Sequence, residues 1–96
     1  MLVLITYDVS TKDAAGNKRL RSVAKACMAH GQRVQNSVFE CLLSETQFRE
    51  LKHHLEQLID TESDSLRFYM LGNRYQNKAI HLGAKTTYSP EEALII

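Results

Sequence analysis

The segment at residues 2–9, Leu-Val-Leu-Ile-Thr-Tyr-Asp-Val, constrains the fold most. In a β-strand successive side chains point to opposite faces, so residues 3, 5, 7 and 9 would share one face and residues 2, 4, 6 and 8 the other. Both faces begin with aliphatic side chains. We therefore expect a strand that is covered on both sides, by helices on one face and by a partner subunit on the other.

The rest of the chain alternates helical and extended patterns. Apolar residues at helical spacing predict a helix over residues 18–30 with Gly31 as its C-cap, and a second helix from residue 44 to residue 60. Ser44 and Gln47 form a capping-box pattern at the start of the second helix. Alternating residues predict strands at 33–35, 37–43 and 65–71. This order predicts an α+β, ferredoxin-like βαββαβ fold.

Length and the two termini complete the expected organisation. The 96 residues are enough for one domain, which we expect to span residues 1–83 and to include an extra C-terminal strand at 78–82. Residues 84–96 end in Leu-Ile-Ile, so we predict a tail that docks on the partner of a homodimer. No apolar run is long enough to span a membrane and no signal-peptide pattern is present, which indicates a cytoplasmic protein without a membrane partner.

A single carboxylate, Asp8, ends the first strand. Burying an unpaired charge is costly, so this side chain requires solvent, a cation or a metal ion. Mg²⁺, or Mn²⁺ in its place, prefers oxygen ligands, and Mg²⁺ retains several waters, so one or two carboxylates can hold it. Two chains related by a two-fold axis could bring two Asp8 side chains together. The alternative is an aspartate that only caps the strand end. Ser10 could add a hydroxyl ligand or cap the loop.

Basic residues are concentrated towards the N-terminus. Residues 1–40 carry a net charge of +3, whereas residues 41–66 carry −4. The first region is a candidate anion-binding face, on which Arg19, Arg21 and Arg33 could bind phosphate through paired N–H donors. Solvated surface arginines are an equal alternative. Cys27 and Cys41 have no metal-type spacing, so we expect buried, reduced thiols.

Four motifs in the chain match one known family. They are Tyr7-Asp8 at the end of the first strand, Lys18-Arg-Leu-Arg21 at the start of the helix, the segment Gln32–Cys41, and Leu71-Gly-Asn. Together they resemble the CRISPR-associated Cas-two family, and its subtype I-C branch in particular. The segment Arg-Val-Gln-Asn-Ser-Val-Phe at residues 33–39 is the most specific of these motifs.

The resemblance implies a function in spacer acquisition. It implies a homodimer with metal-dependent phosphodiesterase activity on single-stranded RNA or double-stranded DNA, in which Asp8 of each chain holds Mg²⁺. The residues that would bind nucleic acid are Lys18, Arg19, Arg21 and Arg33, and those that would support the site are Tyr7, Ser10, Ser37 and Phe39. The family also forms the central DNA-binding dimer between Cas-one integrase subunits.

Two other functions remain as alternatives. One is a purely structural, non-catalytic adaptor that holds DNA for the integrase. The other is an unrelated ferredoxin-like regulatory dimer that binds a small molecule. The four glycines are too dispersed to form a phosphate-binding loop, which argues against the regulatory dimer.

Overall fold

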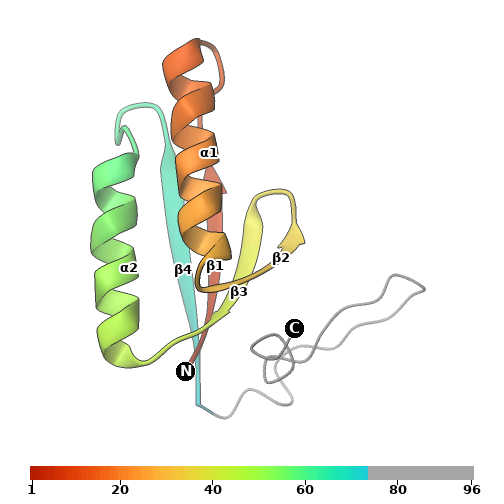
Figure 1. Cartoon of the computed structure of the whole chain (residues 1–96), viewed down its shortest axis with the longest axis vertical. Coiled ribbons are helices and arrows are strands. Elements are labelled where there is room, and N and C mark those ends of the chain that lie inside the picture. Colours follow the sequence, from red (N-terminus) through yellow and green to blue (C-terminus); the bar gives the residue numbers. More distant parts are fainter. Residues whose placement is uncertain (74–96) are drawn as a thin grey trace, which may run out of the picture.

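In the computed structural model, which describes residues 1–73, one antiparallel sheet is covered on a single face by two helices (Figure 1). The elements are β1 (Leu2–Asp8), α1 (Ala14–Met28), β2 (Gly31–Gln35), β3 (Val38–Leu42), α2 (Glu45–Leu58) and β4 (Ser65–Gly72). The strand order in the sheet is β2-β3-β1-β4, so β1 lies between β3 and β4. The βαββαβ order and this pairing confirm the predicted ferredoxin-like fold.

The two faces of β1 differ as the alternation of its residues predicts. Val3, Ile5 and Tyr7 are buried, and they pack in one core with residues of both helices and of β3. We call the opposite side, which neither helix covers, the open face. Its residues, taken from the strand register, are Leu4, Thr6, Asp8, Val38, Glu40, Ser65, Arg67 and Tyr69. Since Val3, Ile5 and Tyr7 face the helices, the alternation of β1 places Asp8 on the open face.

Helix α1 begins four residues before the predicted start, at Ala14. Asp13 is its N-cap, and the Asp13 carboxylate accepts a hydrogen bond from the backbone N–H of Gly16 at 2.8 Å. Gly16 is buried, and a Cβ at this position would overlap the carbonyl oxygen of Ser10. The sequence suggested a loop up to residue 17, but the cap and the close packing of Gly16 make residues 14–17 helical.

The C-terminal end of α1 also differs from the prediction. Ala29 is the C-cap, whereas Gly31 begins β2. A Cβ at Gly31 would overlap the carbonyl oxygen of Glu40, so glycine is needed here for the close approach of β2 to β3 and not for the helix end. Met28, which helical spacing places in the buried stripe, is 60% exposed.

Helix α2 and its contact with β4 follow the sequence pattern. The Ser44 hydroxyl accepts a hydrogen bond from the N–H of Gln47 at 3.1 Å, and the Gln47 side chain accepts one from the N–H of Ser44 at 2.9 Å. The predicted capping box is therefore confirmed. Phe48 of α2 packs edge-on against Phe68 of β4, with ring centroids 5.5 Å apart. This contact fixes β4 under the helix.

The two cysteines are buried free thiols, as the sequence predicts. Burial raises the pKa of Cys27 and of Cys41 to about 12, so neither is a thiolate at neutral pH. Both act as small core residues.

Some of the expected organisation falls outside residues 1–73. This applies to the strand at 78–82, to the tail at 84–96 and to the domain boundary at residue 83. None of the helices in the described range is long and apolar enough to cross a membrane.

Candidate functional site

The side chain of Asp8 is exposed at the end of β1. Its chain neighbours Tyr7 and Val9 point into the core, so the alternation of the strand forces Asp8 onto the open face. Asp8 lies opposite Ser65, the first residue of β4. Its carboxylate has no hydrogen bond or ion pair with any residue in the range 1–73. The sequence left open whether Asp8 meets solvent, a cation or a metal ion. No basic side chain in residues 1–73 pairs with it, and its carboxylate faces solvent.

A metal ion at Asp8 would find one protein ligand in each chain. Residues 1–73 contain no group of three or more His, Cys, Asp or Glu side chains that could hold a metal ion. One exposed carboxylate is compatible with Mg²⁺, which keeps several waters and is commonly held by one or two carboxylates together with phosphate oxygens. The donor set fits Mg²⁺ only if a second Asp8 or a substrate phosphate completes it.

A second aspartate, Asp64, is buried at the same end of the fold, directly before β4. Its side chain has 0% exposure and accepts a hydrogen bond from Arg19 Nε of α1 at 2.9 Å. It also accepts hydrogen bonds from the backbone N–H of Ser10 at 2.9 Å and of Asp60 at 2.9 Å. We call this group the Asp64 clamp, because it ties together the β1–α1 loop, α1 and the α2–β4 turn.

The clamp keeps the Asp64 carboxylate ionised. Burial by itself would raise the pKa of Asp64, but the hydrogen bonds from Arg19, Asp60 and Ser10 outweigh it and lower the pKa below the usual aspartate value. The side chain of Arg19 is 22% exposed, and this carboxylate holds its guanidinium. Arg19 therefore reaches the surface only in part, and the backbone of Ser10, rather than its hydroxyl, makes the contact seen at this loop.

Sequence reasoning did not identify Asp64, which lies between the predicted helix at residues 44–60 and the predicted strand at residues 65–71. Its partners Arg19 and Ser10 are 45 and 54 residues away in the chain. The local pattern gives no signal for contacts at that separation, since a turn aspartate with only local hydrogen bonds has the same sequence context.

Tyr7, Phe39 and Arg33 form a cluster on the helix side of the sheet. The rings of Tyr7 and Phe39 stack with centroids 6.1 Å apart, and the Arg33 guanidinium lies 5.2 Å from the centroid of Phe39. Tyr7 Oη donates a hydrogen bond to the carbonyl of Asn36 at 3.4 Å, and its N–H donates to the carbonyl of Ser37 at 3.1 Å. Burial raises the pKa of Tyr7, while Arg33 opposes the shift. The structure thus groups these predicted residues with one another but on the face opposite Asp8.

The family model for "CRISPR associated protein Cas2" matches residues 1–79 of this chain. The chain belongs to the Cas2 family. It is 60% identical over 95 residues to the CRISPR-associated endonuclease Cas2 of Halalkalibacterium halodurans, with 99% of each chain covered. It is 55% identical over 96 residues to the CRISPR-associated endoribonuclease Cas2 of Nitratidesulfovibrio vulgaris, with 100% of this chain and 94% of the relative covered. These matches confirm the resemblance to the Cas2 family, while its subtype I-C branch stays a prediction.

Solved Cas2 structures share the fold. The crystal structure of Streptococcus pyogenes Cas2 at pH 6.5 superposes with a TM-score of 0.75 at 55% identity and covers 86% of this chain and 100% of that chain. Another crystal structure of Cas2 gives a TM-score of 0.70 at 30% identity, covering 88% of this chain and 87% of the other. The βαββαβ arrangement is therefore that of known Cas2 chains.

Three further basic residues of this Cas2 chain lie along α1. Lys18, Arg21 and Lys25 are exposed, and none of them has an ion-pair partner within residues 1–73. Their spacing of three and four residues places them close together on the helix surface. Among the predicted nucleic-acid-binding residues, Lys18 and Arg21 are thus free to contact a ligand, Arg33 covers Phe39, and Arg19 is engaged by Asp64.

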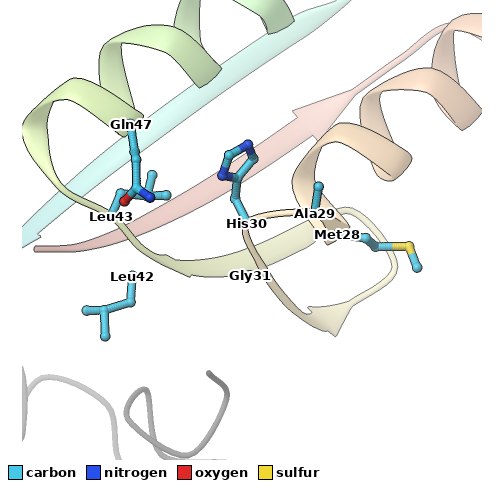
Figure 2. Close-up of a pocket in the computed structure, with 7 residues that line it drawn as sticks. All are labelled: Met28, Ala29, His30, Gly31, Leu42, Leu43 and Gln47. Carbon is cyan, nitrogen blue, oxygen red and sulfur yellow. The ribbon is translucent and has the colours of Figure 1, made fainter. Parts of the chain in front are cut away.

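A hollow of about 290 Å³ lies at the opposite end of this Cas2 fold from Asp8. Figure 2 shows its lining at the C-terminal end of α1 and the N-terminal end of α2. The lining residues are Met28, Ala29, His30, Gly31, Leu42, Leu43 and Gln47. None of the site residues expected from the sequence contributes to it, so the hollow is separate from the Asp8 site.

Proposed function

We propose that this Cas2 chain is a CRISPR adaptation protein that hydrolyses phosphodiester bonds of single-stranded RNA or double-stranded DNA in a metal-dependent reaction. The observation that carries the proposal is the Asp8 carboxylate, which is exposed, ends a core strand and has no partner within residues 1–73. The names of two relatives, an endonuclease and an endoribonuclease, support it.

The proposed active form is a homodimer in which the open faces of two chains approach each other. Leu4 and Val38, which the strand register places on the open face, supply apolar surface there. A two-fold axis near Asp8 would bring two carboxylates together, and each chain would contribute one ligand. Mg²⁺ or Mn²⁺ held there supplies a water activated at neutral pH and neutralises charge on the phosphate.

The residues of the chain have two tasks in this reaction. Asp8 holds the metal from the rigid end of β1, while Lys18 and Arg21 bind backbone phosphates of the substrate. Water adds to phosphorus, one P–O ester bond breaks, and the products are a phosphomonoester and an alcohol. Because the basic contacts go to phosphate and not to bases, we expect no sequence-specific base readout.

The decisive experiment compares Asp8→Asn with Glu50→Gln, a matched control on the exposed side of α2. We expect Asp8→Asn to reduce Mg²⁺-dependent cleavage of labelled RNA and DNA by about a hundredfold or more, because the metal loses its protein ligand. Glu50→Gln should cleave at the wild-type rate. Cleavage by Asp8→Asn at the wild-type rate, with the dimer intact by light scattering, would remove Asp8 from the mechanism.

A second function, a non-catalytic DNA-binding adaptor for the Cas-one integrase, is favoured by the exposed basic residues of α1. It predicts that Asp8→Asn still supports spacer integration in cells, whereas Lys18→Ala combined with Arg21→Ala weakens duplex binding. Loss of integration in Asp8→Asn, with the integrase complex assembled, would contradict a purely structural adaptor. The alternative of an unrelated regulatory dimer is not retained, because the chain belongs to the Cas2 family.

A further inference from the structure

Arg67 of β4 lies on the open face beside Asp8. The register pairs Arg67 with Thr6 and pairs Ser65 with Asp8, so Arg67 and Asp8 are diagonal neighbours on adjacent strands. Diagonal neighbours on one face of an antiparallel pair are about 7–8 Å apart, within reach of long side chains. Neither helix lies between them, because both helices cover the other face (Figure 1).

The guanidinium of Arg67 is exposed and retains most of its donors. Arg67 Nη1 donates a hydrogen bond to Tyr69 Oη at 3.3 Å, and no carboxylate within residues 1–73 pairs with it. Tyr69 is 44% exposed on the same face. An arginine has five N–H donors, so the contact with Tyr69 orients the group and leaves the other donors available. Arg19, which Asp64 holds by Nε and Nη2, has no comparable freedom.

We propose that Arg67, oriented by Tyr69, forms a phosphate-binding subsite next to Asp8. The subsite binds the non-bridging oxygens of the phosphodiester that is cleaved. This inference rests on the proposed nuclease function and adds to it a residue that neither the family motifs nor the sequence analysis identified.

The chemistry of the reaction requires a cation at this position. Two Asp8 carboxylates and one divalent ion carry no net charge together, so they leave the charge of the phosphodiester and the further negative charge that develops on its oxygens during attack by water without compensation. A guanidinium binds two phosphate oxygens at once and stays protonated throughout. Arg67 therefore stabilises the charge without giving or taking a proton, and the overall hydrolysis remains balanced by water alone.

An alternative explanation is that Arg67 protects the edge of the sheet. β4 is an edge strand in the described sheet, and charged residues on edge strands discourage pairing with other chains. The alternation of the strand argues for the subsite, because Arg67 projects from the face that carries Asp8 and not along the edge. The two explanations differ in what the substitution changes, either cleavage or association.

The test compares Arg67→Ala and Arg67→Lys with Arg49→Ala, a matched control on the exposed side of α2. We measure kcat and KM for Mg²⁺-dependent cleavage, the Mg²⁺ concentration for half-maximal rate, and the mass of each variant by light scattering. Arg67→Ala should lower kcat/KM by roughly ten- to a hundredfold, as expected for the loss of a charge-assisted contact, with the Mg²⁺ requirement unchanged. Arg67→Lys should recover part of the loss, and Arg49→Ala should match wild type.

Two results would overturn the proposal. One is a wild-type kcat/KM for Arg67→Ala. The other is a change in the mass of Arg67→Ala at the concentration where wild type is dimeric, which would assign Arg67 to association. If wild type itself does not cleave, the nuclease proposal fails, and the subsite is then tested by duplex binding, measured by fluorescence anisotropy. Weaker binding by Arg67→Ala than by Arg49→Ala supports the subsite. Equal binding by the two variants overturns it.

Discussion

Asp8 and Asp64 lie at the same end of the fold, yet their surroundings are opposite. Asp8 is exposed and its carboxylate has no partner in residues 1–73, whereas the Asp64 side chain is fully buried and accepts hydrogen bonds from three residues. Asp64 immediately precedes Ser65, which pairs with Asp8 in the sheet. The comparison shows how one carboxylate can hold the loops in place so that the other remains available for a ligand.

The largest expected effect is a loss of stability when Asp64 is removed. Asp64→Ala leaves the Arg19 guanidinium and the N–H groups of Ser10 and Asp60 without their acceptor, so we expect the free energy of unfolding to fall by about 3 kcal/mol. Asp8→Ala removes an exposed carboxylate and should change it by less than about 0.5 kcal/mol. Urea denaturation of both variants at one protein concentration measures the difference. Equal losses would mean that the Asp64 clamp does not stabilise the fold.

The same comparison predicts how stability depends on pH. Because the folded-state pKa of Asp64 is lowered, its contribution is fully present above the unfolded pKa of about 3.9 and is lost as the pH falls through the folded pKa. We expect wild type to exceed Asp64→Asn in unfolding free energy by a constant amount near neutral pH, and the two curves to converge below about pH 4. Urea unfolding at a series of pH values tests this, and a gap that widens in acid would contradict it.

The strands and the Asp8 site were accessible from the sequence because their determinants are local. The alternation around Ile5 and Tyr7 is enough to place Asp8 on the open face. Ser44 and Gln47 lie within one turn of each other, so their capping box could be predicted. The position of Asp8 and the capping box each depend on residues that are close together in the sequence.

Asp64 and Arg67 were missed because they depend on residues far apart in the chain, whereas the start of α1 was missed although its determinants are local. Gly16 was interpreted as a loop residue, but its packing against Ser10 and the cap by Asp13 make it helical. The burial and the hydrogen bonds of Asp64 depend on Ser10 and Arg19, which approach it only when the chain is folded. Arg67 becomes notable only when the register of β1 and β4 is known, because a one-residue slip would move it to the other face.

The smallest expected effect separates two arginines that are two positions apart on α1. Arg21 is exposed, whereas Arg19 is held by Asp64, so only Arg21 should displace counterions from a bound duplex. A phosphate contact contributes about 0.9 to the slope of log affinity against log salt concentration. We therefore expect Arg21→Gln to reduce that slope by about 0.9 and Arg19→Gln to leave it unchanged.

Fluorescence anisotropy with a DNA duplex at several salt concentrations measures these slopes, and circular dichroism confirms that both variants are folded. The affinity at one salt concentration is not sufficient, because Arg19→Gln also disturbs the Asp64 clamp and could weaken binding through the loop that contains Ser10. The slope is independent of that disturbance, since it counts phosphate contacts only. If Arg19→Gln lowers the slope as much as Arg21→Gln, Arg19 contacts the backbone and the Asp64 clamp must open when nucleic acid binds.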